Sequence, residues 1–264
     1  MNRGDGVKRR ALVGGATSGL GRASAEELAR AGCDLLLWSR RADALAEVAA
    51  SLRADHGVTV HVVAADAADP AAAGQVADAA LAALGGVDVC VLNAGGPPPC
   101  PPDQTDPDGW RHALQLLTVT PIDLATRLLP GMRERRYGRI VAVLSSGVRE
   151  PLPELAYSNG GRAALAAWMK TVSSAVAADG VTVNGVLPGR IATPRVESLD
   201  RGRAQRLGTE VGEVRRASEA SIPAGRYGEP AEFAAAVGFL ASAAASYVTG
   251  TFLSCDGGMA RGWL

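Results

Sequence analysis

The sequence lacks the features that mark several classes of protein. Its four cysteines are scattered without a C-x-x-C pair, and its three histidines show no metal-ligand spacing. We therefore expect reduced, partly buried cysteines and no metal site. Basic and acidic residues balance at 27 each, so the net charge gives no indication that nucleic acid or a membrane is a partner.

Long hydrophobic runs are also missing. No apolar stretch is long enough to span a bilayer, and the polar residues 1–10, followed by a short apolar run, do not resemble a signal peptide. We therefore expect a cytoplasmic protein. The 264 residues suit one α/β domain over residues 1–264, without repeats or an interdomain linker.

Short apolar runs alternate with longer, alanine-rich amphipathic stretches. This alternation predicts a doubly wound, Rossmann-type parallel sheet of about seven strands, with helices on both faces. The predicted strands are Ala11–Val13, Cys33–Trp38, Val58–Ala64, Val87–Leu92, Arg139–Leu144, Val181–Leu187 and Thr251–Ser254. The predicted helices are roughly 19–31, 41–54, 70–84, 107–136, 155–178 and 230–241.

Two stretches interrupt this alternation. The proline-dense Gly95–Asp103 predicts a stiff extended loop, and Arg190–Pro223 is long, charged and only weakly helical in pattern. Both follow predicted strands, and loops at the carboxyl ends of parallel strands form the ligand crevice of such sheets. We expect residues 190–223 to form a lid. Its many arginines are interleaved with acids, which favours internal ion pairs over recognition of an anionic substrate or a carrier protein.

A glycine-rich turn, residues 14–21 (GGATSGLG), follows the first predicted strand and leads directly into a helix. Glycine permits a tight turn and a close approach of the backbone to a pyrophosphate, and the helix N-terminus offers free N–H groups. In this position the pattern predicts a dinucleotide site. The residues expected to contact the cofactor here are Gly15, Thr17, Ser18, Gly19 and Leu20.

The end of the second predicted strand indicates which dinucleotide is bound. An acidic residue there would bind the adenosine 2′-hydroxyl and repel a 2′-phosphate. This chain instead has Ser39 followed by Arg40 and Arg41. Because guanidinium pairs well with phosphate, we predict NADP(H), with Arg40 as the preferred contact. Alternatively, both arginines are simply solvated at a helix start.

The GxxxGxG spacing of the turn resembles the short-chain dehydrogenase/reductase family, and particularly its 3-oxoacyl-carrier-protein reductases. Further motifs agree in order and position over nearly the whole chain. They are Asp66-Ala67, Asn93-Ala94-Gly95, Pro188-Gly189 with Thr193, and residues 225–230 (GRYGEP), 247–250 (YVTG) and 256–258 (DGG). The resemblance implies that Asp66 and Ala67 contact the adenine and that Asn93, Ala94 and Gly95 lie along the cofactor. It also implies that Pro188, Gly189, Ile191 and Thr193 hold the nicotinamide end.

The family shares a catalytic tetrad of Asn, Ser, Tyr and Lys, and this chain departs from it at three positions. Leu117 aligns with the Asn, whereas Ser145 matches the Ser. The family spacing places Ser158 and Arg162 at the Tyr and Lys positions. Tyr157 is present but lies one residue early.

Two alternatives follow for this helix. In the first, Ser158 and Arg162 face the substrate, and Arg162 also binds the cofactor ribose, although arginine cannot shuttle protons. In the second, a shift at the helix start lets Tyr157 reach the substrate with a lowered pKa. Tyr157 could equally be an ordinary half-buried aromatic residue.

The sequence thus favours an NADP(H)-dependent reductase of a small metabolite. Without an optimised Tyr–Lys pair, we expect an activated acceptor, such as a quinone-like carbonyl or an enone, or a substrate with its own acidic group. The alternatives are a nucleotide-binding, non-catalytic partner subunit and a non-redox lyase or isomerase. The resemblance further implies a homo-oligomer, a dimer or tetramer, formed through helices 107–136 and 155–178.

Overall fold

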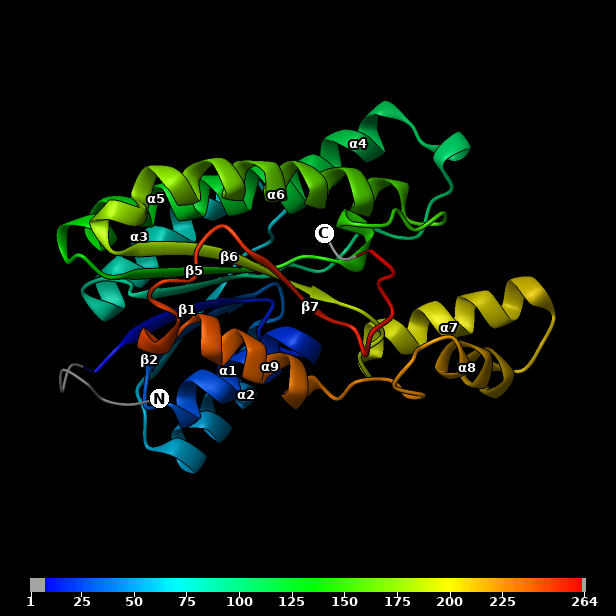
Figure 1. Cartoon of the computed structure of the whole chain (residues 1–264). Helices are drawn as coiled ribbons and strands as arrows, with labels where there is room; N and C mark the ends of the chain where they lie inside the picture. The colour runs from blue at the N-terminus through cyan, green and yellow to red at the C-terminus, as the bar shows by residue number, and fades with distance from the viewer. Residues whose placement is uncertain (1–7, 263–264) are drawn as a thin grey trace.

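The computed structural model describes residues 8–262 and contains one seven-stranded parallel sheet of order β3-β2-β1-β4-β5-β6-β7 (Figure 1). Every predicted strand occurs, with its ends shifted by at most two residues, so the predicted fold class is confirmed. The strands are β1 (Arg10–Gly14), β2 (Asp34–Ser39), β3 (Val60–Ala64), β4 (Val89–Leu92), β5 (Gly138–Val143), β6 (Val181–Pro188) and β7 (Phe252–Cys255).

Helices cover both faces of the sheet (Figure 1). One face carries α1 (Gly19–Arg30), α2 (Ala42–His56) and α9 (Pro230–Leu240), and the other carries α3 (Ala72–Leu84), α5 (Thr120–Glu134) and α6 (Ala156–Val176). The central strands are buried on both sides, which explains their continuous apolar sequences. Alternate strand residues therefore enter two separate cores, as Leu12 and Val13 of β1 do.

The single helix predicted over 107–136 is wrong, because the structure divides it. A π-helical turn, Gln115–Val119, separates α4 (Pro107–Leu114) from α5. Pro121 has no N–H to donate to the carbonyl of Leu117, so the regular hydrogen-bond ladder fails at this point. The buried Thr118 hydroxyl donates instead to the carbonyl of Gly161 in α6 (2.8 Å). Hydrophobic periodicity cannot detect this break.

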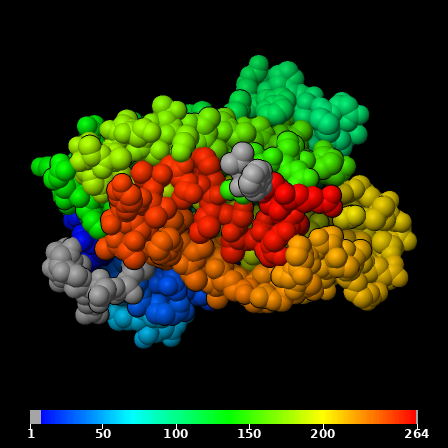
Figure 2. Space-filling view, viewed as in Figure 1, coloured from blue at the N-terminus to red at the C-terminus, as the bar shows by residue number. Residues whose placement is uncertain are grey.

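The predicted lid is more helical than its sequence pattern suggested. It contains α7 (Pro194–Leu207) and α8 (Val211–Ala220), which project beyond the carboxyl ends of the strands (yellow to orange in Figures 1 and 2). Thr193 caps α7 by accepting a hydrogen bond from Val196, and Pro194 occupies the first turn. The capping residue and the proline at its start therefore predict this helix better than the spacing of its apolar residues does.

Two further expectations concern the surface. Within residues 8–262, no helix combines the length and apolar character needed to cross a bilayer, while a cytoplasmic location stays a prediction. Along α6, Ala163, Ala164 and Ala167 are exposed and Trp168 is half-buried. This small, largely apolar face is available for the expected oligomer, which also stays a prediction.

A buried carboxylate ties the amino-terminal edge of the sheet together. Asp88 is 2% exposed and accepts hydrogen bonds from Arg10 Nη2 (2.8 Å) and Arg135 Nε (3.1 Å). Burial alone would raise the pKa of this carboxyl, but the hydrogen bonds and charge of Arg10, with the charge of Arg135, lower it. The ionised form of Asp88 is thus the one that stabilises the fold.

We predict that Asp88→Asn lowers the free energy of unfolding at pH 7 by about 3–5 kcal/mol, because two arginines lose their buried partner. Since the folded-state pKa lies below the unfolded value of about 3.9, the contribution of Asp88 is present above that pH and is lost on acidification. Urea unfolding at pH 7 and at about pH 2, below the unfolded pKa, measures both effects. Asp123→Asn, in the exposed Arg127 pair, is the control and should change stability by less than about 1 kcal/mol. Equal losses in the two variants would contradict the prediction.

Candidate active site at the carboxyl ends of the strands

The turn between β1 and α1 has the geometry of an anion site. Gly15 has a φ of 59°, a left-handed conformation that side chains rarely adopt. Ser18 precedes α1 in an extended conformation and makes no side-chain cap. The first N–H groups of the helix therefore remain available to a ligand at its positive end.

Asn93, at the end of β4, forms a hydrogen bond with this turn. Its side-chain nitrogen donates to the carbonyl of Gly14 (3.0 Å). A Cβ on Gly14 would lie 2.3 Å from the carbonyl oxygen of Asn93 and 2.9 Å from the indole nitrogen of Trp38. Only glycine allows the turn to pack this closely, so Asn93 positions the predicted phosphate site.

Two of the residues predicted to contact the adenosine 2′-position lie against the turn between β1 and α1. The hydroxyls of Thr17 and Ser39 lie 3.3 Å apart, and Arg41 Nη2 donates to the Thr17 hydroxyl (3.3 Å). Arg40 is exposed and has no hydrogen-bond or ionic partner within residues 8–262. The geometry therefore brings Arg41, rather than the preferred Arg40, onto the turn.

The remaining cofactor motifs lie along the same edge of the sheet. Asp66 is exposed after β3 and its carboxylate accepts from the N–H of Ala68, while Ala67 is buried. Ala94 and Gly95 follow Asn93 after β4, and Leu20 packs at the edge of one core. The backbone of Gly189 bonds to Cys255 and that of Ile191 pairs with Gly228, which fixes the segment after Pro188.

Thr193 brings the two sides of the crevice together. It is 6% exposed, and its methyl carbon lies 3.4 Å from the position that a Cβ on Gly19 would occupy. The amino ends of α1 and α7 therefore adjoin. This contact places the start of the lid beside the predicted phosphate site.

The catalytic candidates Ser145 and Arg162 are both anchored near the end of β5. A guanidinium nitrogen of Arg162 donates to the carbonyl of Val143 (2.5 Å), two residues before Ser145. The Ser145 hydroxyl accepts from the N–H of Gly147 (3.0 Å), which leaves its own proton free to donate. Burial, followed by the charge of Arg195, lowers the pKa of Arg162 to about 10, so the side chain still carries its charge at neutral pH.

Ser158 lies one helical turn before Arg162 on α6. It is 8% exposed, and its hydroxyl has no hydrogen-bond partner in the described part of the chain. Leu117, at the position of the family's Asn, is buried against the backbone of Gly161. This placement is compatible with the first of the two helix alternatives, and the choice between them stays a prediction.

Tyr157 turns toward α4 instead. Its hydroxyl accepts from the N–H of Asp106 (2.8 Å) and donates to the Asp106 carboxylate (3.3 Å). Its ring packs edge-on against Trp110, with centroids 5.1 Å apart. The Asp106 N–H alone would lower the tyrosine pKa, but burial and the Asp106 charge outweigh it and raise the pKa. The expected lowering is therefore contradicted, because an acid and not a guanidinium faces the phenol.

Two residues beside these candidates, Arg195 and Asp106, were not predicted from the sequence. Arg195, counted only among the lid arginines, reaches across the crevice and donates from Nη2 to the carbonyl of Pro97 (2.8 Å). Its position directly after Thr193-Pro194, where a helix begins, is the signal that could have identified it. Asp106, the partner of Tyr157, carried the ordinary sequence signal of a helix cap before Pro107.

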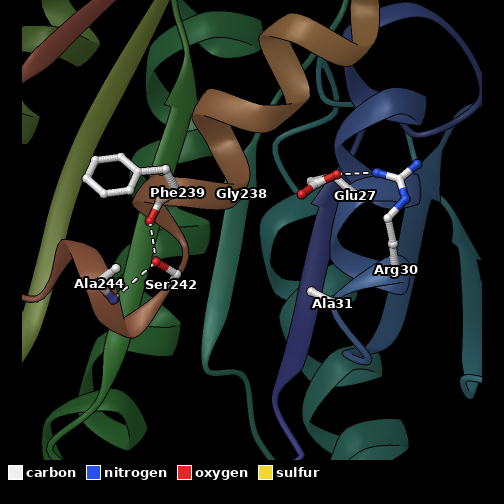
Figure 3. A pocket seen from close by; sticks show the side chains of 7 residues that line it. All are labelled: Glu27, Arg30, Ala31, Gly238, Phe239, Ser242 and Ala244. Carbon is white, nitrogen blue, oxygen red and sulfur yellow. Dashed lines mark hydrogen bonds and ion pairs between the residues drawn. The ribbon is translucent and has the colours of Figure 1, made fainter. Parts of the chain in front are cut away.

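A pocket of about 320 Å³ lies elsewhere, between α1 and α9 (Figure 3). It opens near the carboxyl end of α1, about 18 Å along the helix from the phosphate turn. Its ionic side chains, Glu27 and Arg30, pair with each other. It is therefore separate from the crevice and contains no unpaired charge.

The lid is held to the sheet by a buried carboxylate. Asp200 of α7 is 4% exposed and accepts hydrogen bonds from Arg190 and from the Tyr227 hydroxyl (2.8 Å). Both donors belong to the segments next to β6 and α9. Asp200 thus fixes α7 relative to the candidate site.

We predict that Asp200→Asn lowers Tm by about 5 °C, because the loss of a buried charged acceptor shifts Tm by roughly 2–4 °C per kcal/mol at this chain length. Deuterium uptake should rise in residues 194–220 and stay unchanged in β1 and β4. The control is Arg203→Ala, an exposed position on the same helix. Unchanged uptake in the lid of Asp200→Asn would contradict the role assigned to this carboxylate.

Comparisons with known proteins identify the family of this chain. A model of the family described as enoyl-(acyl carrier protein) reductase matches residues 15–260. The chain is 34% identical over 251 residues to the 3-oxoacyl-[acyl-carrier-protein] reductase FabG of Vibrio cholerae, covering 94% of this chain and 96% of that protein.

Two solved structures are similarly close in fold. The L-sorbose reductase of Gluconobacter frateurii, complexed with NADPH and L-sorbose, superposes with a TM-score of 0.91 at 32% identity, covering 97% of each chain. An NADPH-bound short chain oxidoreductase of Pseudomonas aeruginosa, described as containing an atypical catalytic center, superposes with a TM-score of 0.86 at 28% identity. That match covers 96% of this chain and 97% of the other. The chain therefore belongs to the short-chain dehydrogenase/reductase family of NAD(P)-dependent oxidoreductases.

Proposed function

We propose that this protein is an NADP(H)-dependent reductase acting on an activated carbonyl or enone group of a small metabolite. The observation that carries the proposal is the cluster of Thr17, Ser39 and Arg41 at the turn after β1. It offers hydroxyls and a cation where an acidic residue would favour NAD(H). The relatives solved with NADPH support the same assignment.

The residues present fit a bound dinucleotide. The uncapped start of α1 would receive the pyrophosphate, and Arg41, assisted by Arg40, would receive the 2′-phosphate. Asp66 and Ala67 would border the adenine, and the segment from Pro188 to Thr193 would border the nicotinamide. When bound, the nicotinamide supplies the hydride that the protein itself cannot provide.

The chain's own contribution to chemistry is orientation and charge. Ser145 would donate its free proton as a hydrogen bond to the substrate oxygen. Arg162, fixed on the Val143 carbonyl, would stabilise negative charge developing on that oxygen, and it would also contact the cofactor ribose. Ser158, one helical turn before Arg162, offers a second hydroxyl. Through this hydroxyl, water could deliver the proton that the substrate oxygen needs.

The nature of the acceptor follows from what these groups cannot do. Neither a serine nor an arginine is an efficient general acid at neutral pH. General acid–base catalysis usually contributes about 10²–10⁴-fold in rate, so an acceptor that needs little protonation suits this site best. A relative described as having an atypical catalytic center supports the view that the family tolerates such changes.

Tyr157 is the second candidate for the proton donor. The motif spacing favours it, since it is the tyrosine nearest the family position. Its bonds to Asp106 and its contact with Trp110 favour instead a role in holding α4 against α6. Direct comparison of the variants distinguishes these two roles.

We predict that wild-type protein binds NADPH at least about 10-fold more tightly than NADH, and that Arg41→Ala removes most of this preference. The reason is that one charge-assisted contact with the 2′-phosphate accounts for roughly 10- to 100-fold in affinity. Fluorescence titration with NADPH and with NADH measures the two affinities. Arg40→Ala measures how much the second arginine contributes to the preference for NADPH. Arg127→Ala on α5 is the control and should leave both affinities unchanged. Tighter binding of NADH by the wild type would contradict the NADP(H) assignment.

We further predict that Ser145→Ala and Arg162→Met each lower kcat/KM for NADPH oxidation by about 100-fold or more, since each removes a group that stabilises the developing oxyanion. Phenanthrenequinone and 2,3-butanedione serve as activated acceptors. Ser158→Ala should have a smaller effect, and Tyr157→Phe should keep most of its turnover with a slightly lower Tm. Loss of turnover in a normally folded Tyr157→Phe would identify Tyr157 as the acid instead.

A further inference from the structure

Asn159, which follows Ser158 on α6, bonds back to the loop between β5 and α6. Its side-chain nitrogen donates to the carbonyl of Leu152 (2.8 Å), and its Oδ1 accepts from the N–H of the same residue (3.4 Å). A carboxamide has one accepting and one donating end, and here both ends are used by a single residue of the loop. The side chain of Asn159 is therefore held in one orientation.

The carboxamide oxygen of Asn159 also packs against Gly147 in this loop. A Cβ on Gly147 would collide with Asn159 Oδ1. Gly147 does not have a positive φ, so its backbone conformation would accept other residues. The requirement for glycine at this position therefore comes from the close approach of Asn159.

Gly147 connects this contact to the candidate Ser145. The N–H of Gly147 donates to the Ser145 hydroxyl (3.0 Å), and the position of the missing Cβ lies 3.3 Å from the same oxygen. Asn159 Oδ1 and Ser145 Oγ therefore lie on the same side of Gly147. Because a hydroxyl that accepts one N–H directs its own proton elsewhere, the position of Gly147 determines where Ser145 can donate.

The turn that begins at Ser145 is otherwise held by short-range backbone bonds and by an exposed side chain. The N–H of Val148 donates to the carbonyl of Ser145 (3.1 Å). The exposed Arg149 donates to the carbonyl of Phe252 in β7 (2.9 Å). Asn159 instead fixes the turn to α6, the helix that carries the other catalytic candidates.

We propose that Asn159 is a positioning residue of the reductase site. Its carboxamide, fixed by Leu152, holds Gly147 so that the Ser145 hydroxyl presents its proton to the substrate oxygen. This inference rests on the proposed reductase function, in which Ser145 stabilises the negative charge that develops on that oxygen. Since the loop occupies both ends of its carboxamide, Asn159 acts on the reaction through Ser145.

Asn159→Ala should lower kcat for NADPH oxidation with phenanthrenequinone by about 10-fold, because a misplaced hydroxyl loses much of its stabilising effect. The dissociation constant of NADPH should stay within about 2-fold of the wild-type value. In a Ser145→Ala background, Asn159→Ala should have no further effect on kcat, since the group that it positions is gone. Thr171→Ala, exposed on the same helix, is the control and should change neither quantity.

Gly147→Ala tests the same contact from its other side. Alone it should also lower kcat, because the added Cβ collides with Asn159 Oδ1. In an Asn159→Ala background it should cost little more, because the collision is removed. If Asn159→Ala did not fold, Gly147→Ala measured with and without Ser145 would decide the proposal by itself.

Amide hydrogen exchange measures the positioning without any turnover. The N–H at position 147 should exchange about 10-fold faster in Asn159→Ala than in the wild type, with no change in β6. The proposal is overturned if this exchange is unchanged, or if Asn159→Ala lowers kcat by the same factor with and without Ser145. A wild type that reduced no acceptor would remove the reductase function, whereas the exchange at position 147 would still decide whether Asn159 holds the turn.

Discussion

The close approach of the end of β4 to the turn after β1 is the constraint on which the site depends. The side chain of Asn93 binds the carbonyl of Gly14, at a separation that leaves no room for a Cβ on that glycine. In the sheet order, this is where consecutive connections leave in opposite directions, which opens a crevice between neighbouring strands. Around this contact lie the uncapped amino end of α1, the hydroxyl of Ser39 at the end of β2, and the start of the lid.

The fold and the glycine-rich turn after β1 could be predicted from sequence because both depend on local patterns. Buried parallel strands must be continuously apolar, and a phosphate turn needs glycine between a strand and a helix. The π-helical turn could not be predicted in this way. It arises where Pro121 leaves a carbonyl without its donor and Thr118 bonds to a residue 43 positions away. The helicity of the lid was similarly underestimated, because a charged helix has little apolar period and is defined by its cap.

The orientation of Tyr157 shows the limit of motif spacing most clearly. Spacing places a phenol within one residue of the family position, but a helix turns by about 100° per residue. That rotation separates a side chain that faces the crevice from one that packs on α4. Only the contacts of Asp106 and Trp110 reveal which side the ring occupies. The choice between Arg40 and Arg41 was likewise a matter of side-chain direction, which composition does not encode.

The hydrogen bond between Arg195 and Pro97 has a consequence for turnover. It joins the start of the lid helix to the loop after β4 across the mouth of the crevice. A ligand that enters or leaves the crevice past this contact requires the hydrogen bond between Arg195 and Pro97 to break. In such an arrangement, release of product and reopening of the lid become one event, which can limit the rate even when the chemistry is fast.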